Sequence, residues 1–161
     1  MARSVYIETT VVSYLTAWPS KEVIRAAHQQ ITKEWWQFRR NDFDLFISEF
    51  VIVEASAGDT SAVADRLDIL TDIPLLEVTS EIEMLAKELV AKRAVPEKAA
   101  TDAFHISVAA IHNIDYLLSW NCRHIANAEM QEAIRMVCNE NGFWFPRICT
   151  PEELLGDRLN V

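Results

Sequence analysis

The chain has little of what disordered, disulfide-rich or membrane-spanning proteins require. Its 161 residues include only three glycines and five prolines, and half of the residues are hydrophobic. This composition predicts a globular protein rather than a disordered one. Apolar runs stay far below the roughly 20 residues needed to cross a bilayer, and no basic segment followed by an apolar one opens the chain. We therefore expect a cytoplasmic protein that does not contact membranes.

Cysteine is scarce, and its spacing excludes the usual cysteine-based scaffolds. Cys122, Cys138 and Cys149 are odd in number and form no CxxC pair. We expect free thiols in a reducing compartment rather than a disulfide framework. Cys122 and His124 offer soft ligands without a matching second pair, so a zinc site is not expected either.

Two nucleotide-binding and hydrolase motifs are absent, and basic residues are few. No glycine-rich phosphate loop is present, which excludes P-loop and Rossmann nucleotide sites, and the serine-hydrolase nucleophile elbow is missing. The net charge of −9 argues against a broad basic face for nucleic acid. It remains compatible with clustered acids that contact phosphates through metal ions, and with a basic protein partner.

The pattern that is present alternates short apolar runs with amphipathic ones. We expect strands at residues 5–10, 43–47, 75–78, 116–119 and 146–149. We expect helices at residues 21–40, 49–57, 60–70, 80–93, 98–112 and 128–141, and another from 151 that Thr150 and Glu153 would cap. This alternation predicts an α/β fold with a mainly parallel sheet, as a single domain over residues 1–161.

The long helix expected at residues 21–40 has an apolar stripe. Ser20 can cap the helix, and the stripe consists of Ile24, Ala27, Ile31, Trp35 and Phe38. Trp36 lies off this stripe. We expect a neighbouring helix or a second subunit to cover it.

Four polar residues stand out because their sequence neighbours are apolar. Glu8, followed by Thr9, ends the first strand; Glu54 and Asp102 lie in apolar helices; Asn121 follows the strand at 116–119. A buried carboxylate is costly unless it is paired, hydrogen-bonded or bound to a metal. No lysine or arginine lies within a helical turn of Glu8 or Glu54. Carboxylates that lack a cationic partner suit Mg²⁺ or Mn²⁺.

Each of these residues also has a purely structural interpretation. Glu8 can cap the following turn, and Glu54 can lie on a solvated helix face. Asp102 can be a first-turn acid favoured by the helix dipole, and Asn121 can cap residues 122–126. Considered together, two strand ends and two apolar helices that all deliver polar groups favour a functional site at the carboxyl edge of the sheet.

Four segments in order resemble the motif regions of PIN domains, which include the VapC-type ribonuclease toxins. They are residues 5–10 (VYIETT), 54–59 (EASAGD), 102–106 (DAFHI) and 116–121 (YLLSWN). The resemblance covers nearly the whole chain. It implies a three-layer α/β/α fold with a five-stranded parallel sheet.

The resemblance also implies an activity, a metal-dependent endoribonuclease that uses a metal-activated water. Glu8, Glu54 and Asp102 would bind Mg²⁺ or Mn²⁺, Asn121 would occupy the fourth catalytic position, and Ser119 would orient that fourth ligand or the water. RNA would be the substrate, a small antitoxin protein would be a partner, and a homodimer is expected.

Three further residues are candidates for supporting roles. Thr9 adjoins Glu8. His105 lies three residues after Asp102 on the same side of its helix, so it either joins the site or is a satisfied core histidine. Arg123 either meets a phosphate or pairs with a neighbouring acid.

The sequence departs from the family pattern at two of the motif positions. The family usually has aspartate where this chain has Glu8 and Asn121. A longer carboxylate and an uncharged amide would weaken a metal site. The alternative function is therefore a degenerate, non-catalytic PIN domain that binds protein or RNA.

Overall fold

The structure is a computed structural model that describes residues 1–156. Within this range, five strands form one parallel sheet in the order β3-β2-β1-β4-β5. The strands are β1 (Arg3–Ile7), β2 (Phe43–Ser48), β3 (Leu75–Leu76), β4 (Tyr116–Leu118) and β5 (Arg147–Cys149). The helices are α1 (Thr9–Thr16), α2 (Val23–Phe38), α3 (Glu49–Ala55), α4 (Thr60–Leu70), α5 (Ser80–Ala91), α6 (Ala100–Ile111) and α7 (Ala128–Glu140).

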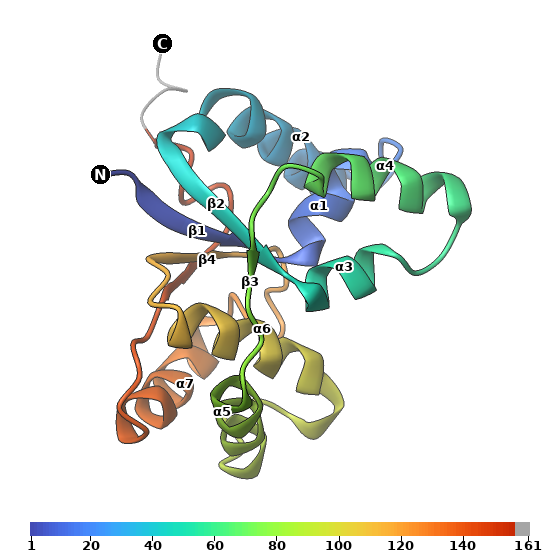
Figure 1. Ribbon diagram of the computed structural model, residues 1–161. Coiled ribbons are helices and arrows are strands. Elements are labelled where there is room, and N and C mark those ends of the chain that lie inside the picture. The colour runs from blue at the N-terminus through green and yellow to red at the C-terminus, as the bar shows by residue number, and fades with distance from the viewer. Residues whose placement is uncertain (157–161) are drawn as a thin grey trace.

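Helices cover both faces of the sheet. Helices α1, α2 and α4 lie on one side, and α5, α6 and α7 lie on the other (Figure 1). This arrangement confirms the predicted three-layer α/β/α fold with a five-stranded parallel sheet.

Strand β1 is the centre of the sheet and of the core. Val5, Tyr6 and Ile7 are fully buried, because β1 has a strand on each side and a helical layer over each face. All strands are parallel, so the ends of β1, β2 and β4 meet at one edge. The sheet therefore brings together the polar residues found at these ends, which include Glu8, Ser48 and Ser119.

The first strand is shorter than predicted. It ends at Ile7, and Glu8 begins α1 as its N-cap, where the side chain accepts a hydrogen bond from the Thr10 N–H (3.1 Å). The prediction of a strand through residue 10 is wrong there, because α1 starts immediately at Thr9. The carboxylate still lies at the carboxyl edge of the sheet.

The prediction of a helix from residue 151 is also wrong for the described residues, which form turns. Thr150 and Glu153 do make the expected capping contacts, with the Thr150 N–H donating to Glu153 Oε1 (3.0 Å). However, the Arg39 guanidinium donates to the carbonyls of Leu154 (3.1 Å) and Leu155 (2.6 Å). These carbonyls are therefore satisfied without a helix. The remainder of the expected helix lies outside the described residues.

Helix α2 buries only part of the predicted apolar stripe, around Trp35, and exposes its two ends. Ile24 and Phe38 are 73% and 50% exposed, whereas Gln29 and Thr32 are buried. The buried polar groups have partners: the Gln29 amide bonds backbone at residues 18 and 20, and Thr32 Oγ1 accepts from the Trp120 indole N–H (2.7 Å). Hydrogen bonding has thus outweighed apolar periodicity in orienting this helix.

Trp36 is covered within the chain itself. It is half-buried against the core, and the Arg40 guanidinium lies 4.7 Å from the centre of its ring. Part of the Trp36 ring is therefore covered by a cation–π contact with Arg40, which lies just beyond the end of the same helix.

The structure bears on two predictions made from the composition, one about the cysteines and one about membrane-spanning segments. All three cysteines are free thiols, as predicted, and Cys138 and Cys149 are buried. Burial raises the pKa of Cys138 to about 11, which keeps this thiol protonated and unreactive. Along residues 1–156, no helix has the length and apolar character that a bilayer crossing requires.

Candidate active site

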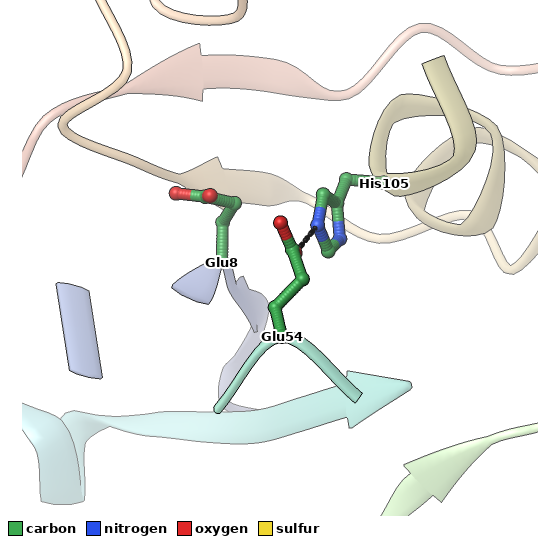
Figure 2. Close-up of side chains that lie close together, drawn as sticks. All are labelled: Glu8, Glu54 and His105. Carbon is green, nitrogen blue, oxygen red and sulfur yellow. Dashed lines mark hydrogen bonds and ion pairs between the residues drawn. The ribbon is translucent and has the colours of Figure 1, made fainter. Parts of the chain in front are cut away.

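Three side chains from different elements converge where β1 and β4 end. Glu8 follows β1, Glu54 lies in α3 and His105 lies in α6. One ligand atom from each lies within 4.8 Å of the other two. Figure 2 shows the Glu54 carboxylate between Glu8 and the imidazole, with Glu54 bonded to His105. Glu8 is 2% exposed and His105 is fully buried, whereas the Glu54 side chain is 35% exposed. Solvent therefore reaches the cluster on the side of Glu54.

Glu8 is fixed by hydrogen bonds to one of its two oxygens. Oε2 accepts from the backbone N–H and the hydroxyl of Thr10, and from the Ser119 hydroxyl (2.8 Å). Burial raises the pKa of Glu8, while the charge of His105 and these hydrogen bonds partly offset that rise. The structural interpretation of Glu8 is thus confirmed, because the residue caps α1, and the same carboxylate also lies in the cluster.

Glu54 and His105 form a close pair. Glu54 Oε1 accepts from the Thr9 hydroxyl (2.8 Å) and is bonded to His105 Nε2. Burial by itself would raise the pKa of Glu54, but the hydrogen bond and charge of His105, together with Thr9, lower it overall. Burial would likewise lower the pKa of His105, yet Glu54 and the neighbouring acids raise it. The pair is therefore an ion pair when no metal is bound.

The second nitrogen of His105 joins a buried chain of hydroxyls. Nδ1 lies 2.7 Å from the Tyr6 hydroxyl, which lies 2.7 Å from Ser48 Oγ. Tyr6, Ser48 and His105 are all fully buried. Sequence reasoning missed Tyr6 and Ser48. A buried tyrosine on the central strand, with a serine ending the next one, was the available signal.

Asp102 is electrostatically linked to the cluster but stands apart from its tight centre. It lies half-buried in the first turn of α6, one turn before His105. Burial raises its pKa and so does the charge of Glu54, while His105 and a hydrogen bond with Asn121 lower it. The trio of ligand atoms described above does not include Asp102, which was predicted as the third metal ligand.

Asn121 and Ser119 shape the loop after β4. Asn121 Oδ1 accepts from the N–H groups of Arg123 (3.3 Å) and His124 (3.1 Å), which is the predicted capping role. The Asn121 N–H donates to Ser119 Oγ (2.9 Å), and that hydroxyl donates to Glu8. The loop therefore supports Glu8 through Ser119. The Arg123 side chain is exposed to solvent beside it.

The donor set suits a divalent cation bound by oxygen and nitrogen. The hydrogen bonds of Glu8 all go to Oε2 and those of Glu54 all go to Oε1, so each carboxylate keeps a second oxygen for a ligand. Among residues 1–156, no lysine or arginine forms an ion pair with Glu8, Glu54 or Asp102. Two carboxyls lie close to one imidazole and a third, Asp102, is electrostatically coupled to it, so a cation would balance the remaining negative charge.

The Glu54–His105 pair predicts a specific pH dependence of stability. The raised pKa of His105 adds stability that is complete below pH 6.5, its ordinary pKa, and is lost as pH rises through the folded value. The lowered pKa of Glu54 adds stability that is complete above pH 4.5 and is lost as pH falls. The destabilisation caused by His105→Gln should therefore be greatest between pH 4.5 and 6.5.

Urea denaturation in EDTA from pH 4 to 9 measures this difference. Glu8 and Asp102 remain in the variant, but the charge of His105 opposes the rise in the pKa of each, so their titration contributes to the difference along with that of the pair. A difference between the two proteins that does not change with pH would show that the pair is not ionised.

Comparison with known proteins assigns most of this architecture to one family. The family model described as PIN domain matches residues 5–127, which contain every residue of the cluster. No curated protein matches the chain.

Proposed function

The chain belongs to the PIN domain family, whose members are generally nucleases, and we propose that it is a metal-dependent endoribonuclease. The observation that supports this most directly is the meeting of Glu8, Glu54 and His105 at one edge of the sheet, with Asp102 electrostatically coupled to them. Buried acids without a lysine or arginine partner are costly to maintain, and activity often requires such destabilised groups.

We propose that Glu8, Glu54 and Asp102 hold Mg²⁺ or Mn²⁺. When bound, such a cation neutralises phosphate charge and activates a water for attack on a phosphodiester. The protein's own contribution is to hold the ligands still: Thr10 and Ser119 position Glu8, and Thr9 and His105 position Glu54.

Substrate contacts would come from the loop after β4. Asn121 orders this loop by accepting two backbone N–H groups. We propose that the exposed Arg123 side chain on the same loop contacts an RNA phosphate. Ordering this loop is the proposed role of Asn121 at the fourth catalytic position, since its amide oxygen is already engaged by the backbone.

We further propose the biological role of a VapC-type toxin, with a small antitoxin as partner and a homodimer as assembly. Support comes from exposed apolar side chains near the start of α2. Trp18, Val23 and Ile24 are 93%, 84% and 73% exposed. Neighbouring large apolar groups exposed to this degree are typical of protein interaction surfaces.

The proposed activity is tested by adding and removing the cation. Saturating Mn²⁺ should raise the melting temperature above that in EDTA, since a ligand at roughly 100 times its Kd stabilises by about 2.7 kcal/mol. Hydrolysis of a labelled single-stranded RNA should require the same cation. Hydrolysis that continues unchanged in EDTA would contradict the proposal.

A second candidate is a non-catalytic binding module, favoured by the structural roles of Glu8 and Asn121. Glu8 caps α1 and Asn121 caps the loop after β4, so both residues have a function without a metal. This candidate predicts no melting shift with Mn²⁺. It also predicts that fluorescence anisotropy would detect RNA binding equally well in EDTA.

A further inference from the structure

We propose that His105 is itself a metal ligand through Nε2, which makes the site a Glu–Glu–His site that prefers a transition metal such as Mn²⁺ to Mg²⁺. This inference rests on the proposed metal-dependent function and specifies the kind of cation. It also replaces Asp102 with His105 in the tight ligand set.

The imidazole of His105 lies within the cluster of possible ligand atoms. The ligand atoms of Glu8, Glu54 and His105 all lie within 4.8 Å of one another, and Nε2 is the nitrogen that faces Glu54. Figure 2 shows the ring pointing toward the Glu54 carboxylate, with Glu8 on the far side of Glu54. His105 is fully buried, so no solvent competes for this nitrogen.

The opposite nitrogen is held as a metal-binding histidine requires. A ligating imidazole almost always hydrogen-bonds through its other nitrogen, which fixes the tautomer and the ring orientation. Here Nδ1 has the Tyr6 hydroxyl at 2.7 Å, and that hydroxyl has Ser48 Oγ at 2.7 Å. With Nδ1–H donating to Tyr6, and Tyr6 donating to Ser48, Nε2 is the nitrogen that loses its proton and then presents a lone pair to the site.

Metal binding would exchange a proton for the cation. In the metal-free protein Nε2 bonds Glu54 Oε1. This bond offsets the free-energy cost of burying a charged imidazole. On binding, the Nε2 proton leaves to solvent, and the cation takes Nε2 together with carboxylate oxygens of Glu8 and Glu54. The hydrogen bonds that fix Oε2 of Glu8 need not break, because its Oε1 has none of them.

The nitrogen ligand decides the preference among cations. Mg²⁺ strongly favours oxygen ligands and near-ideal octahedral geometry, whereas imidazole suits first-row transition metals. A site with one imidazole and two carboxylates therefore favours Mn²⁺ and later divalent metals over Mg²⁺.

Pulsed EPR of the Mn²⁺-loaded protein tests ligation directly, without reference to activity. Wild type labelled with ¹⁵N-histidine should show coupling between Mn²⁺ and a histidine nitrogen. The coupling should vanish in His105→Gln and persist in His124→Gln. His124 is the matched control because it is half-buried and acts electrostatically on Asp102.

Calorimetric titration separates ligation from positioning. Loss of a ligand in His105→Gln should weaken Mn²⁺ binding by about 100-fold and leave Mg²⁺ binding within a few fold. An equal weakening for both cations would show that His105 only positions Glu54, and would overturn the proposal. Should His105→Gln fail to fold, the variants His28→Gln, His112→Gln and His124→Gln decide, because coupling that persists in all three can come only from the fourth histidine, His105.

The outcomes also distinguish this proposal from the proposed function. Mn²⁺ bound without histidine coupling, or coupling lost in His124→Gln instead, would overturn the role of His105 and leave the metal-dependent nuclease standing. Absence of Mn²⁺ binding to wild type would overturn both.

Discussion

Replacing Asp102 with asparagine should reduce RNA hydrolysis by about 100-fold or more while leaving the fold intact. Asp102 is half-buried one turn before His105, and both burial and the charge of Glu54 raise its pKa. Asparagine keeps the shape and the ability to hydrogen-bond Asn121 but removes the negative charge near the cation. For the same reason, the melting temperature in EDTA should stay the same or rise.

Two measurements on the same preparation check this prediction. Hydrolysis of a labelled RNA is measured at saturating Mn²⁺, and melting is measured in EDTA and in Mn²⁺. Asp65→Asn, at an exposed position of α4, makes the same chemical change away from the site and should behave as wild type. Equal hydrolysis by Asp102→Asn and wild type would remove Asp102 from the site.

Replacing Trp35 with alanine should lower the free energy of unfolding by about 3–5 kcal/mol, enough to threaten the fold. The Trp35 side chain on α2 is fully buried in the core. The centre of its ring system lies 5.9 Å from that of Phe43 and 6.5 Å from that of Trp36. Its indole N–H finds no acceptor within residues 1–156, so the loss would come from packing and cavity formation.

Urea denaturation followed by circular dichroism measures this loss against two controls. Trp36→Ala removes the same side chain from the next position, where it is half-buried under Arg40, and should cost less than half as much. Trp35→Phe fills more of the cavity and breaks no hydrogen bond, so it should lie between Trp35→Ala and wild type. Similar losses for the two alanine variants would contradict the burial described here.

The sequence by itself was sufficient for the fold class and for the edge of the sheet at which Glu8 and Ser119 lie. Apolar runs that alternate with amphipathic helices require a parallel sheet covered on both faces, and parallel strands end at one edge. Polar residues at the ends of two apolar runs, Glu8 and Ser119, were therefore expected at the same edge of the sheet. In the structure they do meet, through a hydrogen bond of 2.8 Å.

Only the tertiary structure decided which atoms touch within that site. His105 is bonded to a glutamate 51 positions away and to a tyrosine 99 positions away, so its partners depend on how α6 packs against α3 and β1. Sequence spacing placed His105 on the same side of its helix as Asp102, but it carried no information about Tyr6 or Ser48. Tyr6 and Ser48 lie on β1 and β2, and they come close to His105 only because α6 packs against these strands.

Tertiary contacts also overrode two local patterns, for a common reason. Apolar periodicity predicted a buried stripe along α2, of which only the part around Trp35 is buried, and a capping box predicted a helix after Thr150. In the structure, Thr32 bonds the Trp120 indole and Arg39 bonds the carbonyls of Leu154 and Leu155. Such hydrogen bonds join positions 88 to 116 residues apart. Local propensity, at a few tenths of a kcal/mol per residue, is too weak to resist a buried polar group that must be satisfied.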